Sequence, residues 1–330
     1  MSTRLRYLTV IASVLILALA LAGCGAQPTA APSAAYAPKT VTFIAPSKAG
    51  SGFDTTGRAV VSTLEKEKLV TFPMPVQNAS APPEGIATIV LQNKGKDDMI
   101  SVGSIAILLN KASGASPYGP MDTTPIAILI STNYGVLVRD DSPYKTLKDF
   151  LNDLKTQPEK TPICGGQSDD RIAYGALALA YGAEMKKINY AAYAGGTEAS
   201  AVLLEGSCKA EITTVDDVIG LIESKKVRVL ATSGGKRLSG VFSTVPTFKE
   251  AGVDLEWVNF RYIAGGPGMP AYAVKWWQDT LAKMVKTATW KENLDKFRWV
   301  DIFQTTDVDK YIAAKQETVN KVATELGLKQ

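Results

Sequence analysis

The sequence predicts an α/β protein built from two lobes, and three observations support this. The chain has 330 residues, which is more than a single compact core usually needs. Short apolar runs alternate with amphipathic segments along most of its length, the pattern of strands alternating with helices. Glycine-rich loops follow several of the predicted strands. The hydrophobic content of 46% and charged content of 21% are ordinary for a globular protein.

Each element is predicted from its local pattern. The apolar run 41–45 predicts a buried strand, and 54–68 predicts a helix that Asp54 opens and lysines close. Segment 70–77 is strand-like but is interrupted by Pro73 and Pro75. The remaining expected strands are 99–103, 126–129, 134–139, 161–164, 210–214 and 257–264. The remaining expected helices are 83–93, 147–155 and 169–181. The last 60 or so residues predict two helices, a short strand and a long helix.

Two chain positions are interpreted as crossings between the lobes. One lies near residues 138–141, after a predicted strand, and the other is the strand 257–264. The expected division is therefore 40–138 plus 258–330 for lobe 1 and 139–257 for lobe 2. Each lobe is expected to hold a mixed, largely parallel sheet flanked by helices.

The N-terminus carries the pattern of an export signal. Arg4 and Arg6 precede the apolar run 8–22, which is short for a membrane span. The run ends in Leu-Ala-Gly-Cys at Cys24, which resembles a bacterial lipobox. These features predict a lipoprotein signal peptide at 1–23, lipidation of Cys24 and a flexible tether at 24–39. An uncleaved anchor helix with an incidental cysteine is the alternative.

Composition argues against several function classes. The chain contains no histidine, which removes the commonest general base and the commonest zinc ligand. The net charge of +4 is small and scattered, so no nucleic-acid surface is expected. We therefore expect a protein that is not an enzyme and has no cofactor and no metal, with a hydrolase as a distant alternative. Acidic pairs beginning at Asp140, Asp169 and Asp216 could bind metal, but helix capping is the favoured interpretation.

Two cysteines remain in the folded part, Cys164 and Cys208. A disulfide is the first expectation for an exported protein. However, Cys164 falls at the end of the predicted strand 161–164, and Cys208 falls just before the strand 210–214. These positions are at opposite ends of a parallel sheet, so the expectation is that the two cysteines are not paired.

Four loops at strand ends are candidates for ligand binding, because ligands of open α/β sheets bind beyond the carboxyl ends of the strands. They are 46–54, Gly103–Ser104, 165–171 and 190–196. Glycines let the backbone approach a ligand closely, and the free N–H groups of a following helix attract an anion. Loops of this kind in both lobes predict a clamp that closes over its ligand.

The loop motif resembles that of the tripartite tricarboxylate transporter substrate-binding family. The matching residues in 41–58 are Pro46, Ala49, Gly50, Asp54 and Arg58. Further similar segments follow in order at 99–104, 138–150, 193–206, 227–246 and 266–270. The resemblance runs from residue 41 to the C-terminus.

The resemblance implies a two-lobe periplasmic-binding-protein-like (Venus flytrap) fold. It also implies a binding protein that passes its ligand to a permease with one large and one small membrane subunit. With the lipobox, the expectation is an exported, lipid-anchored protein, and we expect it to be a monomer. Expected ligands are dicarboxylates, tricarboxylates, aromatic carboxylates or acidic amino acids. The ligand-binding residues it implies are Ser47, Ala49, Gly50, Ser51, Asp54, Ser104, Gly166, Gln167, Ser168, Tyr193, Ala194, Gly195 and Asp216.

The sequence departs from the family pattern in the loop of lobe 2. Gln-Ser-Asp-Asp-Arg occupies 167–171, where the family has glycines and a histidine. Asp169 and Asp170 would repel an anion unless Arg171 offsets them. Arg261 could clamp a carboxylate, but a solvated strand arginine is the favoured interpretation. An amine-bearing or neutral ligand, or a role as a receptor for a signalling partner, stays open.

Overall fold

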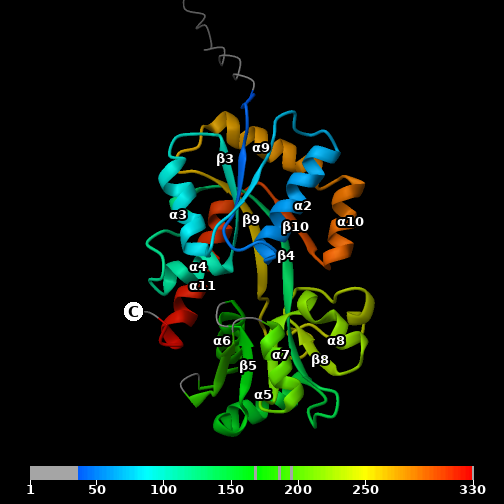
Figure 1. Cartoon of the computed structure of the whole chain (residues 1–330). Helices are drawn as coiled ribbons and strands as arrows, with labels where there is room; N and C mark the ends of the chain where they lie inside the picture. The colour runs from blue at the N-terminus through cyan, green and yellow to red at the C-terminus, as the bar shows by residue number, and fades with distance from the viewer. Residues whose placement is uncertain (1–35, 167–168, 185–186, 194–195, 329–330) are drawn as a thin grey trace, which may run out of the picture. The chain divides into compact units, whose positions relative to one another are not determined.

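The computed structural model describes residues 36–166, 169–184, 187–193 and 196–328, and Figure 1 shows their arrangement. All the elements below belong to the unit Ala37–Gln330. The strands are β1 Thr42–Ala45, β2 Val76–Asn78, β3 Met99–Ser104, β4 Thr124–Arg139, β5 Ile163–Gly166, β6 Tyr190–Tyr193, β7 Ala210–Thr214, β8 Val227–Thr232, β9 Val258–Gly265 and β10 Val300–Gln304. The α-helices are α2 Gly52–Lys66, α3 Pro82–Gln92, α4 Ile105–Ala112, α5 Leu147–Thr156, α6 Asp169–Tyr181, α7 Gly196–Glu205, α8 Ile219–Glu223, α9 Ala271–Met284, α10 Ala288–Phe297 and α11 Val308–Glu325. None of these helices is both long and apolar enough to span a bilayer.

The strands form two groups joined by the strands β4 and β9. In one group, β1 pairs in parallel with β2 and β3, and in the other β5 pairs in parallel with β6 and β7. Strand β9 pairs antiparallel with β3 and β4, and β4 pairs antiparallel with β7 and β8. The result is a two-lobe α/β fold with mixed sheets, as the sequence predicts.

Strand β4 corrects one expectation. The sequence predicted separate strands at 126–129 and 134–139, but Thr124–Arg139 is a single strand of 16 residues. The polar residues between the two apolar runs suggested a break. Those residues are nevertheless paired, because Thr132 and Asn133 lie opposite Asn259 and Val258 of β9. From Tyr134 onward the partners are β7 and β8 instead.

The predicted strand 70–77 is also shorter than expected, since only Val76–Asn78 forms β2. Prolines explain the difference. The carbonyls of Pro73 and Pro75 accept hydrogen bonds from Val41 and Phe43 at 3.1 and 2.9 Å. Proline cannot donate in return, so a regular ladder starts only after Pro75.

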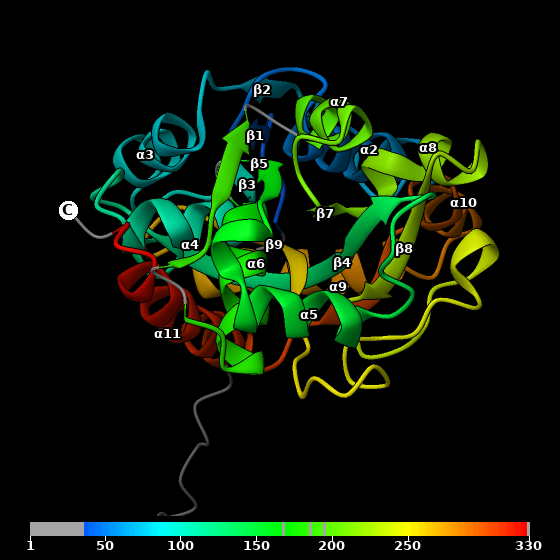
Figure 2. The same cartoon turned by 90° about the horizontal axis from the view of Figure 1, so that it is seen from below.

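Helices cover both faces of the β5–β7 group, which Figure 2 shows from below. Ile163 packs in the cluster that contains Ile172 and Leu177 of α6, whereas the neighbouring Cys164 packs with Leu203 of α7. Successive strand residues point to opposite faces. Helices α6 and α7 therefore lie on opposite sides of these strands.

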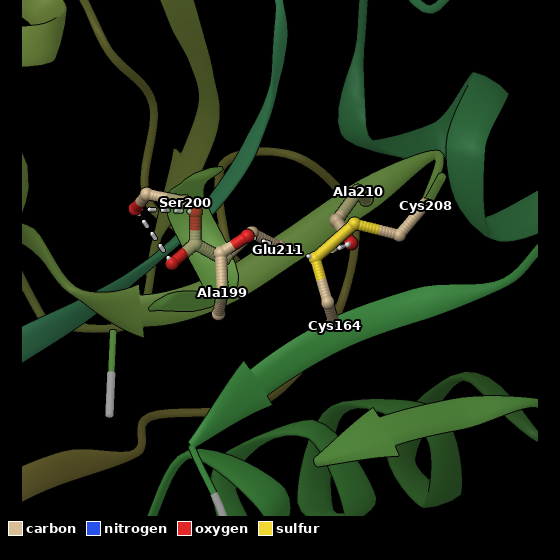
Figure 3. Close-up of a disulfide and its surroundings, with 6 residues drawn as sticks. All are labelled: Cys164, Ala199, Ser200, Cys208, Ala210 and Glu211. Atoms are coloured by element: carbon tan, nitrogen blue, oxygen red, sulfur yellow. Dashed lines mark hydrogen bonds between the residues drawn. A yellow bond between two sulfur atoms is a disulfide. The ribbon is translucent and has the colours of Figure 1, made fainter. Parts of the chain in front are cut away.

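Cys164 and Cys208 form a disulfide with a Cα–Cα distance of 6.0 Å, so the expectation that they are unpaired was wrong (Figure 3). Strand β5 begins at Ile163 and continues to Gly166, which puts Cys164 at its start rather than its end. Ile163 lies opposite Ala210 of the parallel strand β7. Both cysteines are therefore at the amino-terminal ends of neighbouring strands. Beside them, the Ser200 hydroxyl of α7 donates to the buried Glu211 carboxylate, with O···O distances of 3.0 and 2.9 Å.

The C-terminal segment has the predicted order of helix, helix, strand and helix. It packs against the β1–β3 group. Strand β10 pairs with the first half of β4, and Asn293 of α10 donates to Thr63 of α2 at 3.2 Å. Helix α11 lies against α4, where Gln316 donates to the carbonyl of Leu108 at 3.0 Å.

Candidate functional site

The pairing of the strands brings the two sets of predicted loops to one region. Strands β1, β2 and β3 are parallel, so their carboxyl ends lie along one edge, and β5, β6 and β7 likewise share an edge. Ser104 at the end of β3 lies opposite Arg261 of β9, and Thr214 at the end of β7 lies opposite Tyr134 of β4. The middle sections of β4 and β9 therefore run between the two edges.

The loop after β1 turns into α2 through a capped helix start. Gly50 adopts a φ of 82°, a left-handed conformation that glycine accommodates without strain. Ser51 is the N-cap, and its hydroxyl accepts a hydrogen bond from the Asp54 N–H at 3.3 Å. Ser47 is half-buried, whereas Ala49 and Gly50 are exposed. The loop therefore presents backbone and small side chains at the positive end of α2.

The Asp54 side chain holds this loop together. Its carboxylate accepts hydrogen bonds from Gly50 N–H at 2.8 Å, Arg58 Nε at 2.9 Å and Asn78 Nδ2 at 2.9 Å. Asn78 also donates to the carbonyl of Ser47 at 3.0 Å. Burial by itself raises the pKa of Asp54, but the hydrogen bonds from Arg58, Gly50 and Asn78 outweigh it and lower the pKa. Sequence reasoning missed Asn78, because nothing local links it to a loop so far away in the chain.

Asp54→Asn is expected to lower the free energy of unfolding at pH 7, and the deficit should shrink in acid. A folded-state pKa below the unfolded value means that ionised Asp54 stabilises the fold fully above about pH 4. That stabilisation is lost as the pH falls through the folded pKa. Denaturant unfolding of both proteins at pH 7 and pH 3 checks this, with Asp254→Asn on an exposed carboxylate as the control. A deficit that is the same at both pH values would contradict it.

The structure places the other predicted residues as follows. Ser104 is fully buried and caps α4, its hydroxyl accepting from Ala106 N–H at 3.2 Å. The N–H of Gly166 donates to Asp170 at 2.9 Å, and its carbonyl accepts from the Tyr190 hydroxyl at 2.8 Å. Tyr193 is half-buried at the end of β6. Gln167, Ser168, Ala194, Gly195 and the lipidation residue Cys24 lie outside the described residues.

Strand register gathers a polar row of which the sequence analysis considered only Arg261. Thr132 of β4 lies opposite Asn259 of β9, and Arg261 follows Asn259 by two residues. Side chains two apart on a strand, and directly paired side chains, share one face of a sheet. Thr132, Asn259 and Arg261 therefore point to the same side. The signal available in the sequence was polar residues within two otherwise apolar strands.

A cavity of about 230 Å³ borders this row and the start of α2. It contains two of the predicted residues, Gly50 and Asp216, which come from opposite edges. The full lining is Gly50, Gly52, Thr55, Thr56, Thr132, Asp216, Ile219, Arg261, Lys296, Phe297 and Trp299. The hydroxyl oxygen of Thr132 is buried and has no hydrogen-bond partner. This cavity thus combines a helix N-terminus, two cations, one carboxylate and an unsatisfied hydroxyl.

Arg261 corrects the interpretation of a solvated strand arginine, because only 9% of the residue is exposed. Its guanidinium lies 5.1 Å from the centre of the Phe53 ring and donates to Asn259 Oδ1 at 3.0 Å. The sequence did indicate burial, because Arg261 lies within a largely apolar strand. The positive charge of its long side chain favoured the opposite interpretation, that it is exposed to solvent.

The acidic residues at the start of α6 accept hydrogen bonds from other groups of the protein. Asp169 accepts hydrogen bonds from Asn259 at 2.6 Å and from the Tyr134 hydroxyl at 3.3 Å. Burial, together with the nearby Asp169 carboxylate, raises the pKa of Tyr134. Asp170 accepts from Gly166 N–H. Arg171 lines a separate cavity beside α11.

Two larger cavities of about 530 and 480 Å³ exist elsewhere. The first is lined on one side by Lys236, Arg237 and Leu238, and the second by the C-terminal end of α11. Each includes one residue from the first turn of a helix, Tyr311 of α11 and Arg171 of α6, but neither contains a residue of the predicted loop 46–54. Among the described residues, no cluster of three metal-ligating side chains forms. The arrangement at the smaller cavity is chemically that of a binding site for a small polar solute.

The comparisons with known proteins define the class further. A crystal structure of a TctC solute-binding protein from Polaromonas has a TM-score of 0.74 and 23% identity, covering 88% of this chain and 100% of that one. MatC from Rhodopseudomonas palustris with bound malate has a TM-score of 0.67 and 18% identity, covering 87% and 98%. A second R. palustris protein, with adipate, has a TM-score of 0.70 and 20% identity, covering 88% and 98%. The chain thus shares its fold with these proteins.

The family follows from the sequence comparison. The model of the tripartite tricarboxylate transporter family receptor, TctC, matches residues 110–328. The chain belongs to this family, and it is a binding protein rather than an enzyme. It is also 27% identical over 215 residues to the "UPF0065 protein in gbd 5'region" of Cupriavidus necator. That match spans 63% of this chain and 63% of the relative.

Proposed function

We propose that this protein captures a small organic carboxylate outside the cytoplasm and delivers it to a tripartite tricarboxylate-type secondary transporter. The observation that carries the proposal is the cavity at the start of α2. It is lined by Gly50 and Gly52 from the loop after β1 and by Asp216 from beyond β7. A helix N-terminus of this kind favours an anion. Malate and adipate, the ligands of two structural relatives, are of this chemical class and give the probes.

The mechanism we propose is closure of two lobes, 40–138 plus 258–330 and 139–257, over the ligand. The paired middle sections of β4 and β9 are the proposed hinge, since β9 pairs with β3 of one group and β4 continues from its pairing with β9 to β7 of the other group. A ligand that contacts both lobes binds the closed form better and shifts the population toward it. The closed form then docks on the large and small membrane subunits.

We assign ligand contacts to loops from both lobes. From lobe 1 these are Ser47, Ala49, Gly50, Ser51 and Ser104, with Asp54 shaping the loop that presents them. From lobe 2 they are Gly166, Gln167, Ser168, Tyr193, Ala194, Gly195 and Asp216.

The anchoring we propose rests on the N-terminal sequence. Cleavage after residue 23 would leave Cys24 as a lipidated N-terminus. The uncharged segment before Lys39 would then be a tether that lets a monomer reach its transporter from the membrane surface. Palmitate labelling of the expressed protein, lost in Cys24→Ala, tests this assignment.

A thermal-shift screen of the purified protein tests the carboxylate proposal. Malate, adipate, succinate and citrate are compared with putrescine and glucose as cationic and neutral controls. A ligand at 100 times its Kd stabilises the folded state by about 2.7 kcal/mol. We expect a shift with at least one carboxylate, and Ser51→Glu should abolish it because a second anion would stand at the start of α2. Lys249→Glu, far from this loop in the chain and 50% exposed at its side chain, is the matched control.

One observation favours a second candidate, a ligand that carries an amine. The Asp216 carboxylate lines the same cavity as the start of α2, and a carboxylate attracts an ammonium group. A shift with putrescine and with none of the carboxylates would replace the first proposal by this one.

A further inference from the structure

Arg261 is a buried cation that forms no ion pair with the residues that the structure describes. The residue is 9% exposed, and the structure gives its guanidinium one hydrogen bond, from NH1 to the neutral Asn259 amide oxygen. No ion pair involves Arg261 within the described part of the chain. Removing a guanidinium from water costs several kcal/mol unless an opposite charge compensates. The protein therefore maintains a buried charge here with which no described carboxylate pairs directly.

One neighbour of Arg261, the start of α2, increases this cost. A Cβ atom placed on Gly52 would lie 2.8 Å from Arg261 NH2, so the guanidinium lies directly against the first residue of α2. That end of a helix carries a positive partial charge. The guanidinium and the start of α2 therefore repel each other, whereas an anion bound between them would attract both. Glycine at 52 is what allows the two groups to come this close.

The cavity next to Arg261 offers room and a further donor for an anion. Thr132, which is 3% exposed, has a buried hydroxyl without a partner, and it lines the cavity together with Arg261. Asp216 and Lys296 are the other charged residues of the lining. A carboxylate can accept two parallel hydrogen bonds from a planar guanidinium.

Asn259 fixes the position of the Arg261 guanidinium, and Asp169 of lobe 2 in turn fixes the orientation of the Asn259 amide. Asn259 Nδ2 donates to Asp169 at 2.6 Å, which leaves Oδ1 of the same amide to accept from Arg261 at 3.0 Å. The Phe53 ring, 5.1 Å away, supports the other side. Asn259 is thus a positioning residue, and its orientation depends on a carboxylate at the start of α6.

We propose that Arg261 binds a carboxylate of the solute and thereby restricts this receptor to ligands with a carboxylate that fits between Arg261, Thr132 and the start of α2. This deepens the function proposed above and rests on it. Asn259 orients the guanidinium, and the unsatisfied Thr132 hydroxyl donates to the same anion.

The first test needs no ligand. Arg261→Met keeps a long apolar stem against Phe53 and removes the charge. The thermal midpoint of ligand-free Arg261→Met should be equal to or above that of the wild type, because replacing an uncompensated buried charge by an apolar side chain is neutral or stabilising. A lower midpoint would show that Arg261 serves the fold, and it would overturn the proposal. Arg237→Met, which removes a surface arginine paired with Glu250, is the matched control.

The second test uses malate and adipate as probes in isothermal titration calorimetry. The carboxylate that gave the larger thermal shift should bind Arg261→Met about 100-fold more weakly than the wild type. Arg261→Lys should recover part of this loss, since lysine restores the charge without the planar fork. Wild-type affinity in Arg261→Met would refute the role of Arg261 while leaving carboxylate binding intact. A wild type that binds neither probe would instead count against the proposed function, and the ligand-free test would still decide on Arg261.

Discussion

Replacing both Cys164 and Cys208 by alanine should lower the free energy of unfolding by about 4 kcal/mol. The two cysteines are 44 residues apart, and a disulfide that closes a loop of this length restricts the unfolded chain by about that amount. Both side chains are buried, at 0% and 3% exposed. Chemical denaturation of the oxidised wild type and the double alanine variant measures the difference.

Reduction supplies the control for this prediction. Dithiothreitol should lower the stability of the wild type toward that of the double variant and should leave the double variant unchanged. Equal stability of the oxidised wild type and the variant would mean that the disulfide does not restrain the unfolded chain. The effect is expected to reach the candidate site as well, since β5 continues from Cys164 to Gly166.

Gly85→Ala should lower the free energy of unfolding by about 2 kcal/mol, although alanine is the better helix former. Intrinsic propensity favours alanine over glycine by about 1 kcal/mol inside a helix such as α3. Here, however, a Cβ on residue 85 would lie 2.2 Å from Pro46 Cβ and 2.4 Å from Pro46 Cα. The backbone of Pro46 cannot rotate aside as a flexible side chain could, so overpacking outweighs propensity. Denaturant unfolding measures the change.

The same substitution should also weaken binding of the carboxylate probe, because Pro46 begins the loop that leads to Gly50 and α2. Gly220→Ala is the matched control: a Cβ there would meet nothing within 4 Å. It should leave stability unchanged or raise it by up to about 1 kcal/mol. A Gly85→Ala protein that is as stable as Gly220→Ala would show that α3 and the loop can separate without cost.

Local patterns in the sequence were sufficient for most helices and several strands. Helix α6 and strand β7 have the predicted bounds, 169–181 and 210–214. In each case the evidence is local: aspartates at the helix start, and an apolar run at the strand. Helix α2 begins two residues before the predicted Asp54, because Ser51 rather than Asp54 is its N-cap. Serine and aspartate are both preferred N-cap residues, so the sequence pattern does not distinguish a helix capped by Ser51 from one capped by Asp54.

The candidate site was predictable only in part. The loop 46–54 was recognised from its glycines and its place after a strand, and Asp216 from its resemblance to the family. The polar row of Thr132, Asn259 and Arg261 was not, since it depends on the pairing of β4 with β9, segments more than 100 residues apart in the chain. Asp54 was predicted as a ligand contact. In the structure its carboxylate accepts three hydrogen bonds that hold the loop before α2 in place.

The sequence by itself determined the α/β class, the two-lobe organisation, the family and the glycine-rich loop at the start of α2. These follow from periodicity, capping and turn chemistry, which act between residues close together in the chain. Only the tertiary structure decided that 124–139 is one strand, that Cys164 meets Cys208, and that Arg261 is buried beside Gly52 and Asn259. Each of these depends on strand register between distant segments. Register is set by the burial of whole faces of a sheet, so no local pattern reveals which side chains it brings together.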